Sequence, residues 1–137
     1  MATQNSISLP DKMLIDNGIN PQKVHLMKLS TDGFSALGPK TDDYVLVEKD
    51  VPLSNGILVE AHLYGEGLAR LYYRSGELNI FMKFNDPNQI NVFRDGDSNF
   101  KIIGKLQAFL QTDDAPEGHA RISFIKDRVF HQGNAWW

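Results

Sequence analysis

Histidines and carboxylates are the residues of this chain whose types could do chemistry. The histidines fit neither an HxxxH nor an HExxH pattern, the spacings that bring two imidazoles to one metal ion. They are His25, His62, His119 and His131. The chain has no cysteine, so it lacks a thiolate that could bind zinc or act as a nucleophile. The sequence therefore predicts no metal site and no cofactor, and it places His62 at the surface or in an interface.

Two further groups could suggest a site. The adjacent carboxylates Asp42–Asp43 and Asp113–Asp114 are expected at a strand edge and in a linker, where such pairs are usually solvated and not catalytic. Four aromatic residues could form a platform for stacking bases, namely Tyr72, Tyr73, Phe81 and Phe84. Such a platform needs basic surroundings, whereas the chain has a net charge of −3. We therefore expect these aromatics in the core or at an interface, and no direct contact with nucleic acid.

The elements that would position these residues belong to one small domain. A length of 137 residues with 42 % hydrophobic content is enough for a packed core. No apolar run approaches the roughly 18 residues of a membrane span, so no membrane partner is expected. Residues 1–8 are polar and unlike a signal peptide, and we interpret them as a leader or the remnant of a linker. A cytoplasmic location follows as the default.

The apolar pattern predicts one short helix followed by strands. The helix is expected around Met13–Ile15, between Pro10 and Gly18. The strands are short runs of β-branched and aromatic residues separated by turn-forming residues, with a loop at 85–88. Gly65–Gly67 and Ser75–Gly76 are expected to join three of them as a meander. The expected strands are 24–29, 43–48, 56–64, 67–74, 77–84, 89–93 and 100–110.

The order of several segments resembles the peptidase domain shared by LexA, UmuD-type mutagenesis proteins and phage CI-like repressors. The resemblance implies a mostly-β fold, in which twisted antiparallel sheets form a partly open barrel with one short N-terminal helix. It covers residues 9–110 and leaves 111–137 as a C-terminal extension. The matching segments are 9–15 (LPDKMLI), 18–28 (GINPQKVHLMK), 43–47 (DYVLV), 56–71, 85–87 (NDP) and 100–104 (FKIIG).

The resemblance also implies a serine–lysine dyad, in which a neutral lysine amine takes the proton from a serine that attacks a peptide carbonyl. This sequence departs from that pattern at both positions. Alignment of the segment around Met27 puts Gly33 at the position of the nucleophile, and alignment of the hairpin puts Ala69 at the position of the base. Glycine supplies no nucleophile and a methyl group accepts no proton. We therefore expect a domain without a functional dyad.

One alternative keeps the protease. A shifted alignment makes Ser35 the nucleophile, although an ordinary loop serine is the simpler interpretation. The base would then come from elsewhere, for example from Lys83 or Lys40, and neither lies at the matching hairpin position.

The extension 111–137 begins with a polar segment and becomes apolar from residue 120, and its pattern does not decide between helix and strand. Aromatic residues at a chain end either fold back onto the domain or dock on a partner. The candidate partner-binding residues are Phe124, Phe130, Trp136 and Trp137.

Three functions follow from these observations. The first is a non-catalytic regulatory domain of a phage-type or SOS-type repressor, which acts by forming a homodimer or higher homo-oligomer, or by pairing with a related repressor. The second is a self-cleaving serine peptidase that uses Ser35. The third is a stand-alone adaptor that binds partners through residues 111–137.

Overall fold

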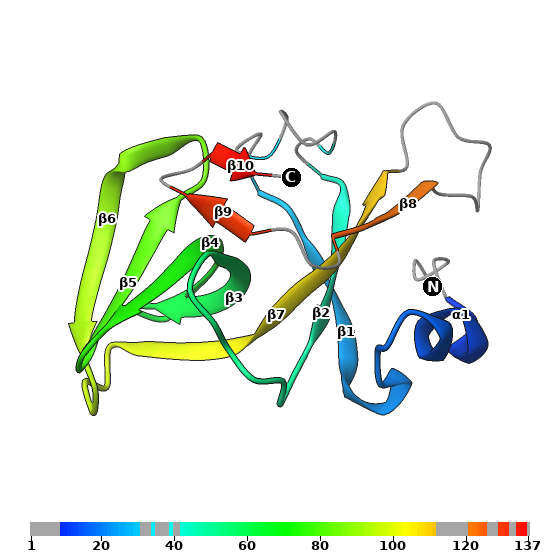
Figure 1. Cartoon of the computed structure of the whole chain (residues 1–137), viewed down its shortest axis with the longest axis horizontal. Coiled ribbons are helices and arrows are strands. Elements are labelled where there is room, and N and C mark those ends of the chain that lie inside the picture. The colour runs from blue at the N-terminus through cyan, green and yellow to red at the C-terminus, as the bar shows by residue number, and fades with distance from the viewer. Residues whose placement is uncertain are drawn as a thin grey trace.

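The computed structural model describes residues 9–30, 34, 39, 42–111, 121–125, 129–131 and 134–136. A short helix and a 3-10 turn come first, and strands follow (Figure 1). No helix in these ranges is long and apolar enough to cross a membrane. The elements are α1 (Asp11–Asp16), η1 (Pro21–Lys23), β1 (Val24–Lys28), β2 (Tyr44–Glu48), β3 (Ile57–Leu63), β4 (Glu66–Ser75), β5 (Leu78–Lys83), β6 (Asp86–Arg94), β7 (Phe100–Gln111), β8 (Arg121–Phe124), β9 (Val129–His131) and β10 (Asn134–Trp136).

Most of the strands form one twisted antiparallel sheet in the order β1-β2-β7-β3-β4-β5-β6, with β8 paired to β7 as well. β9 and β10 form a separate two-stranded sheet. The large sheet does not close, and β1 and β6 are the end strands of this order (Figure 1). The prediction of a mostly-β fold with one short helix is therefore confirmed, and all seven expected strands are present.

The turns differ in detail from the sequence prediction. Tyr64 and Gly65 join β3 to β4, with φ angles of 53° and 82°. Two consecutive positive φ values are typical of a type I′ hairpin turn, whose twist matches that of the flanking strands. The loop expected at 85–88 is wrong, because β6 already begins at Asp86. The β5–β6 register shifts between Met82, which pairs with Ile90, and Lys83, which pairs with Asp86. This shift accommodates residues 87–89 within β6.

β7 is irregular on both sides, and this bends the sheet. Its pairing with β2 shifts between Leu46 and Val47, and its pairing with β3 shifts between Glu60 and Ala61. Such bulges bend a strand and increase its local twist. At the bend a Cβ atom added to Gly104 would lie 2.4 Å from the backbone oxygen of Glu48. Only glycine allows β2 to approach β7 so closely.

Three buried clusters stabilise the fold. α1 and the segment after it cover one face of β2 and β7 with Leu14 and Ile19. An aromatic cluster around Phe81 lies between β3, β4, β5 and β6. The third cluster lies on the other face of β3 and β4, and it contains Ala69. Its members are Leu29, Phe34, Val45, Val47, Leu58, Ala69, Leu71, Phe84, Leu106, Phe109 and Ile125.

Candidate functional site

Ala69 marks the site, since the resemblance assigns the general base to this position. It lies in the middle of β4 and is 7 % exposed. It belongs to the same apolar cluster as Leu58 and Leu71. A methyl group here packs against hydrocarbon, so the position contributes to the core.

Phe34 belongs to the same cluster, although it lies far from Ala69 in the sequence. Its ring stacks on Phe84 with centroids 5.3 Å apart and contacts Phe109 at 5.8 Å. The loop that contains Phe34 leaves β1 and returns to β2, and its ends are joined because Leu29 and Asp43 are hydrogen-bonded through their backbones at 2.8 Å. The structure thus brings the residue next to Gly33 into the same core cluster as Ala69.

Gly33 and Ser35 themselves lie outside the described residues, as does Lys40. Lys83 ends β5 and is half-buried. The expectations for the nucleophile position and for a peptidase that uses Ser35 therefore stay predictions.

Glu60 is the chemically distinctive residue of the site, and sequence analysis missed its role. It lies directly opposite Ala69 in the β3–β4 pairing and is only 8 % exposed. Directly opposite side chains in an antiparallel pair share a face and have Cβ atoms about 4.5–5.5 Å apart. On its other side Glu60 faces Gly104 of β7. A carboxylate therefore lies between two residues with small side chains, beside the position assigned to the base.

His25 of β1 forms a hydrogen bond with this carboxylate. Its Nε2 lies 2.6 Å from Oε1 of Glu60, and the two side chains are 35 % and 11 % exposed. An ionised carboxylate only accepts hydrogen bonds, so the imidazole is the donor. His62 lies next to the other oxygen of Glu60, with 3.9 Å between Nε2 and Oε2. The His25–Glu60 pair compensates the cost of burying this carboxylate.

His62 is exposed at the end of β3, in agreement with the prediction of a surface position. The three residues His25, Glu60 and His62 are not arranged as metal ligands, and no other group of described histidines, aspartates or glutamates is. The signal that could have revealed the pair is Glu60 itself, an acidic residue in a strand that is otherwise almost entirely apolar.

The carboxylate of Glu60 would favour the protonated form of a lysine at position 69. A carboxylate within about 4–6 Å favours the protonated amine, so it raises the amine pKa. A general base of this kind needs the opposite shift, from about 10.4 towards neutrality. The surroundings of position 69, as well as the alanine itself, therefore differ from what a serine–lysine dyad would require.

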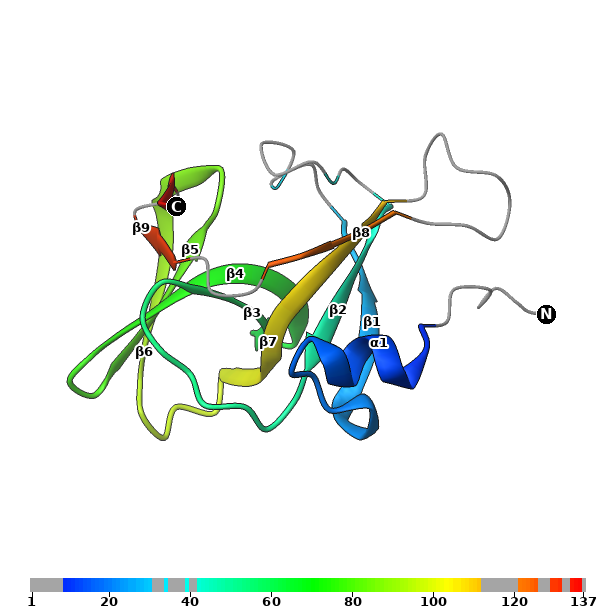
Figure 2. The same cartoon turned by 45° about the vertical axis from the view of Figure 1, so that its right-hand side comes forward.

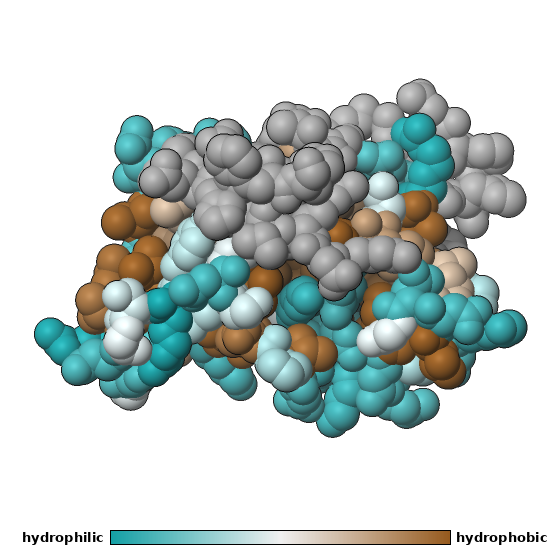
Figure 3. Space-filling view, in the orientation of Figure 1, coloured by the Kyte–Doolittle hydropathy of each residue, from teal (hydrophilic) through white to brown (hydrophobic). Residues whose placement is uncertain are grey.

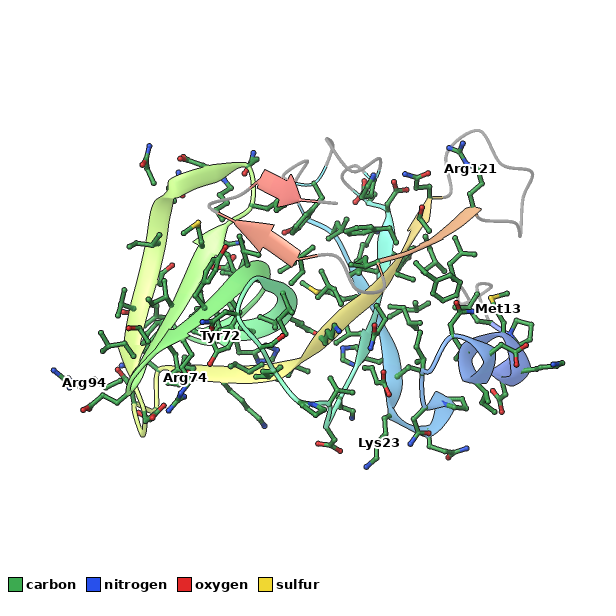
Figure 4. The ribbon with its side chains drawn as sticks, viewed as in Figure 1. Met13, Lys23, Tyr72, Arg74, Arg94 and Arg121 are labelled. Carbon is green, nitrogen blue, oxygen red and sulfur yellow. The ribbon has the colours of Figure 1, made fainter. Side chains whose placement is uncertain are left out.

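A second polar group lies at the opposite end of the same sheet, where β4, β5 and β6 meet. The Tyr72 hydroxyl donates to Asn79 at 2.8 Å, and Asn79 donates to Asp95 at 2.7 Å. Arg74 binds the Asp95 carboxylate through both terminal nitrogens. Hydrogen bonds from Arg74 and Asn79 lower the pKa of Asp95. Figure 4 labels Tyr72, Arg74 and Arg94 at this end of the sheet.

The candidate partner-binding residues of the extension lie in different elements of the structure. Phe124 in β8 is half-buried and packs against the cluster under α1, so β8 adds to the main sheet. Phe130 and Trp136 belong to β9 and β10, where they pair with Ala135 and Val129. Trp137 lies outside the described residues, and the domain boundary at 110 stays a prediction.

Comparison with protein-family models finds no match to this chain, and comparison with curated proteins finds none either.

Proposed function

We propose that this chain is a regulatory domain without peptidase activity, similar to the C-terminal domain of LexA and phage-type repressors. It acts in the cytoplasm by associating with copies of itself or with a related repressor, and it needs no cofactor. The observation that supports this proposal best is the buried carboxylate of Glu60 opposite Ala69. An aliphatic residue replaces the base, and its neighbour would keep any lysine there protonated.

Self-cleavage at alkaline pH tests the loss of activity. The full chain is incubated from pH 7 to about pH 10, and fragments are followed by mass spectrometry. We expect no specific fragments, because no amine at position 69 can accept the proton of a serine. A pair of fragments that disappears in Ser35→Ala would overturn the proposal and establish the peptidase.

A reconstruction tests separately the effect of the missing dyad side chains and the effect of the Glu60 carboxylate. Gly33→Ser with Ala69→Lys restores the two side chains, and adding Glu60→Gln removes the carboxylate that holds the introduced amine protonated. If the triple variant cleaves itself at a lower pH than the double variant, Glu60 suppresses the base as argued. If the double variant cleaves equally well near neutral pH, Glu60 does not silence the site, and the support it gives is withdrawn.

A further inference from the structure

β6 is an outer strand with an unpaired side in the part of the chain that the structure describes. It forms the left border of the sheet in Figure 1, and β5 is its paired neighbour. The Asp95 amide donates to the Glu77 carbonyl at 2.9 Å, so these two residues form a hydrogen-bonded pair. Together with the register, this pair shows which residues of β6 are hydrogen-bonded to β5. Because bonded and non-bonded residues alternate along a strand, residues 90, 92 and 94 direct their backbone N–H and C=O groups away from β5.

The same edge carries exposed apolar side chains. Ile90 is 50 % and Val92 is 47 % exposed, and both lie on one face because they are two residues apart. Their partners on β5 are Met82 and Ile80, which are half-buried and extend the apolar surface inward. Figure 3 shows hydrophobic side chains over this border of the molecule. Native edge strands commonly carry charged residues that prevent pairing, and the middle of β6 has none.

The charges of β6 favour one type of partner. Asp86 begins the strand and Arg94 ends it. An antiparallel second copy brings the acidic start of each strand to the basic end of the other, so the strand is complementary to itself. Such self-complementarity is what a two-fold symmetric contact requires. Arg94 now pairs with Glu77 at 2.8 Å, but both side chains are more than half exposed, so this pair is weak and can rearrange.

We propose that two copies of this chain associate through β6 and form one continuous antiparallel sheet across the dimer. In this register Ile90 of one protomer faces Val92 of the other, and the two-fold axis passes beside Asn91. Arg94 then faces Asn88 of the other protomer and lies diagonal to its Asp86, which a long side chain can reach. Four apolar side chains then cover one another, while residues 90 and 92 of each protomer supply the backbone hydrogen bonds. The inference rests on the proposed function, because it gives the associating domain its partner and its surface.

Solution mass over a concentration series, by sedimentation equilibrium, is the test. Wild type is expected to pass from monomer to dimer, and Ile90→Arg and Val92→Arg are each expected to raise the dimer Kd about tenfold or more. Ile15→Arg is the matched control, since Ile15 is 61 % exposed on α1, away from β6, and the change should leave Kd unaltered. Thermal unfolding of each variant at low concentration checks that the monomer is intact.

Charge exchange tests the antiparallel orientation. Asp86→Arg and Arg94→Asp each place like charges together in a homodimer, so each variant alone should dimerise more weakly than wild type. An equimolar mixture of the two should recover dimerisation, because each strand then meets its opposite charge. Absence of recovery would overturn the proposed orientation.

The outcomes separate the two proposals. A dimer that tolerates Ile90→Arg and Val92→Arg overturns the role of β6 and leaves self-association standing. A wild-type chain that stays monomeric at every concentration overturns both the dimer and the homo-oligomeric function, and it leaves the β6 edge to a different partner.

Discussion

Glu60 and Ile90 lie on the same large sheet, yet the acidic residue is 8 % exposed and the aliphatic residue is 50 % exposed. The centre of the sheet, at β3, β4 and β7, buries a charge and gives it a partner in His25. At the border, Ile90 and Val92 of β6 are about half exposed, and β6 is an end strand of the sheet among the described residues. Figure 2 shows the ribbon of β5 and β6 at this border. The centre of the sheet thus pairs a polar group inside the fold, whereas the border exposes apolar side chains to solvent.

The sheet at the border has a buried face and an outer face. Removing the aromatic contacts of the buried face is expected to lower the free energy of unfolding more than any other change proposed for the sheet. Phe81 is fully buried, and its ring centroid lies 5.5 Å from that of Tyr72 and 5.7 Å from that of Phe100. Phe81→Ala should lower the free energy of unfolding by about 3–5 kcal/mol, measured by urea denaturation. Ile90→Ala, on the outer face, should cost the monomer less than about 1 kcal/mol. Equal losses would show that the two faces do not differ.

The centre depends on close packing of its strands. Gly104→Ala should cost about 3 kcal/mol, because the added methyl would overlap the backbone of Glu48, which cannot move aside as a side chain end can. Gly67→Ala is the matched control, since its added Cβ would meet His62 at an ordinary 3.4 Å. The unfolding free energies of both variants give the comparison. A Gly104→Ala protein as stable as the control would mean that β2 and β7 separate easily.

The buried carboxylate of the centre should depend on its imidazole. His25→Ala leaves Glu60 buried without its donor and should cost about 1–3 kcal/mol. Glu60→Gln in the same background should recover part of this loss, because a neutral amide is cheaper to bury than a carboxylate. A double-mutant cycle of unfolding free energies measures the coupling. Additive effects of the two substitutions would contradict a direct interaction.

Removing the half-exposed Arg74–Asp95 pair at the border should have the smallest effect on stability. The direction in which this effect changes with pH follows from the pKa of Asp95. Hydrogen bonds from Arg74 and Asn79 hold the pKa of Asp95 below its usual range. Because the pKa is lower in the folded state, the stabilisation is present above the unfolded-state pKa of about 4 and is lost as the pH falls through the folded value. Asp95→Asn should therefore be less stable than wild type at pH 7, by an amount that disappears under strongly acidic conditions. A difference that is independent of pH would refute this origin.

The elements with local signals could be predicted from the sequence. Period-two alternation in Ile57–Leu63 and the glycines near 65 and 76 predicted the β3–β4–β5 meander, since these signals act within a few residues. The start of β6 was missed, because Asp86 and its neighbours are turn formers that a register shift places in a strand. The sequence did not decide between helix and strand for the extension from residue 120. Arg121–Phe124 form β8 because they pair with β7.

Composition and strand periodicity determined the fold class from the sequence alone. The sequence alone also shows that position 69 is an alanine and not a lysine. The tertiary structure decided that Glu60 faces Ala69 and that His25, 35 residues away from Glu60, binds it. Those contacts depend on the strand order β2-β7-β3 and on the bend of β7. Long-range register is set by packing over the whole sheet, so no local pattern in the sequence contains it.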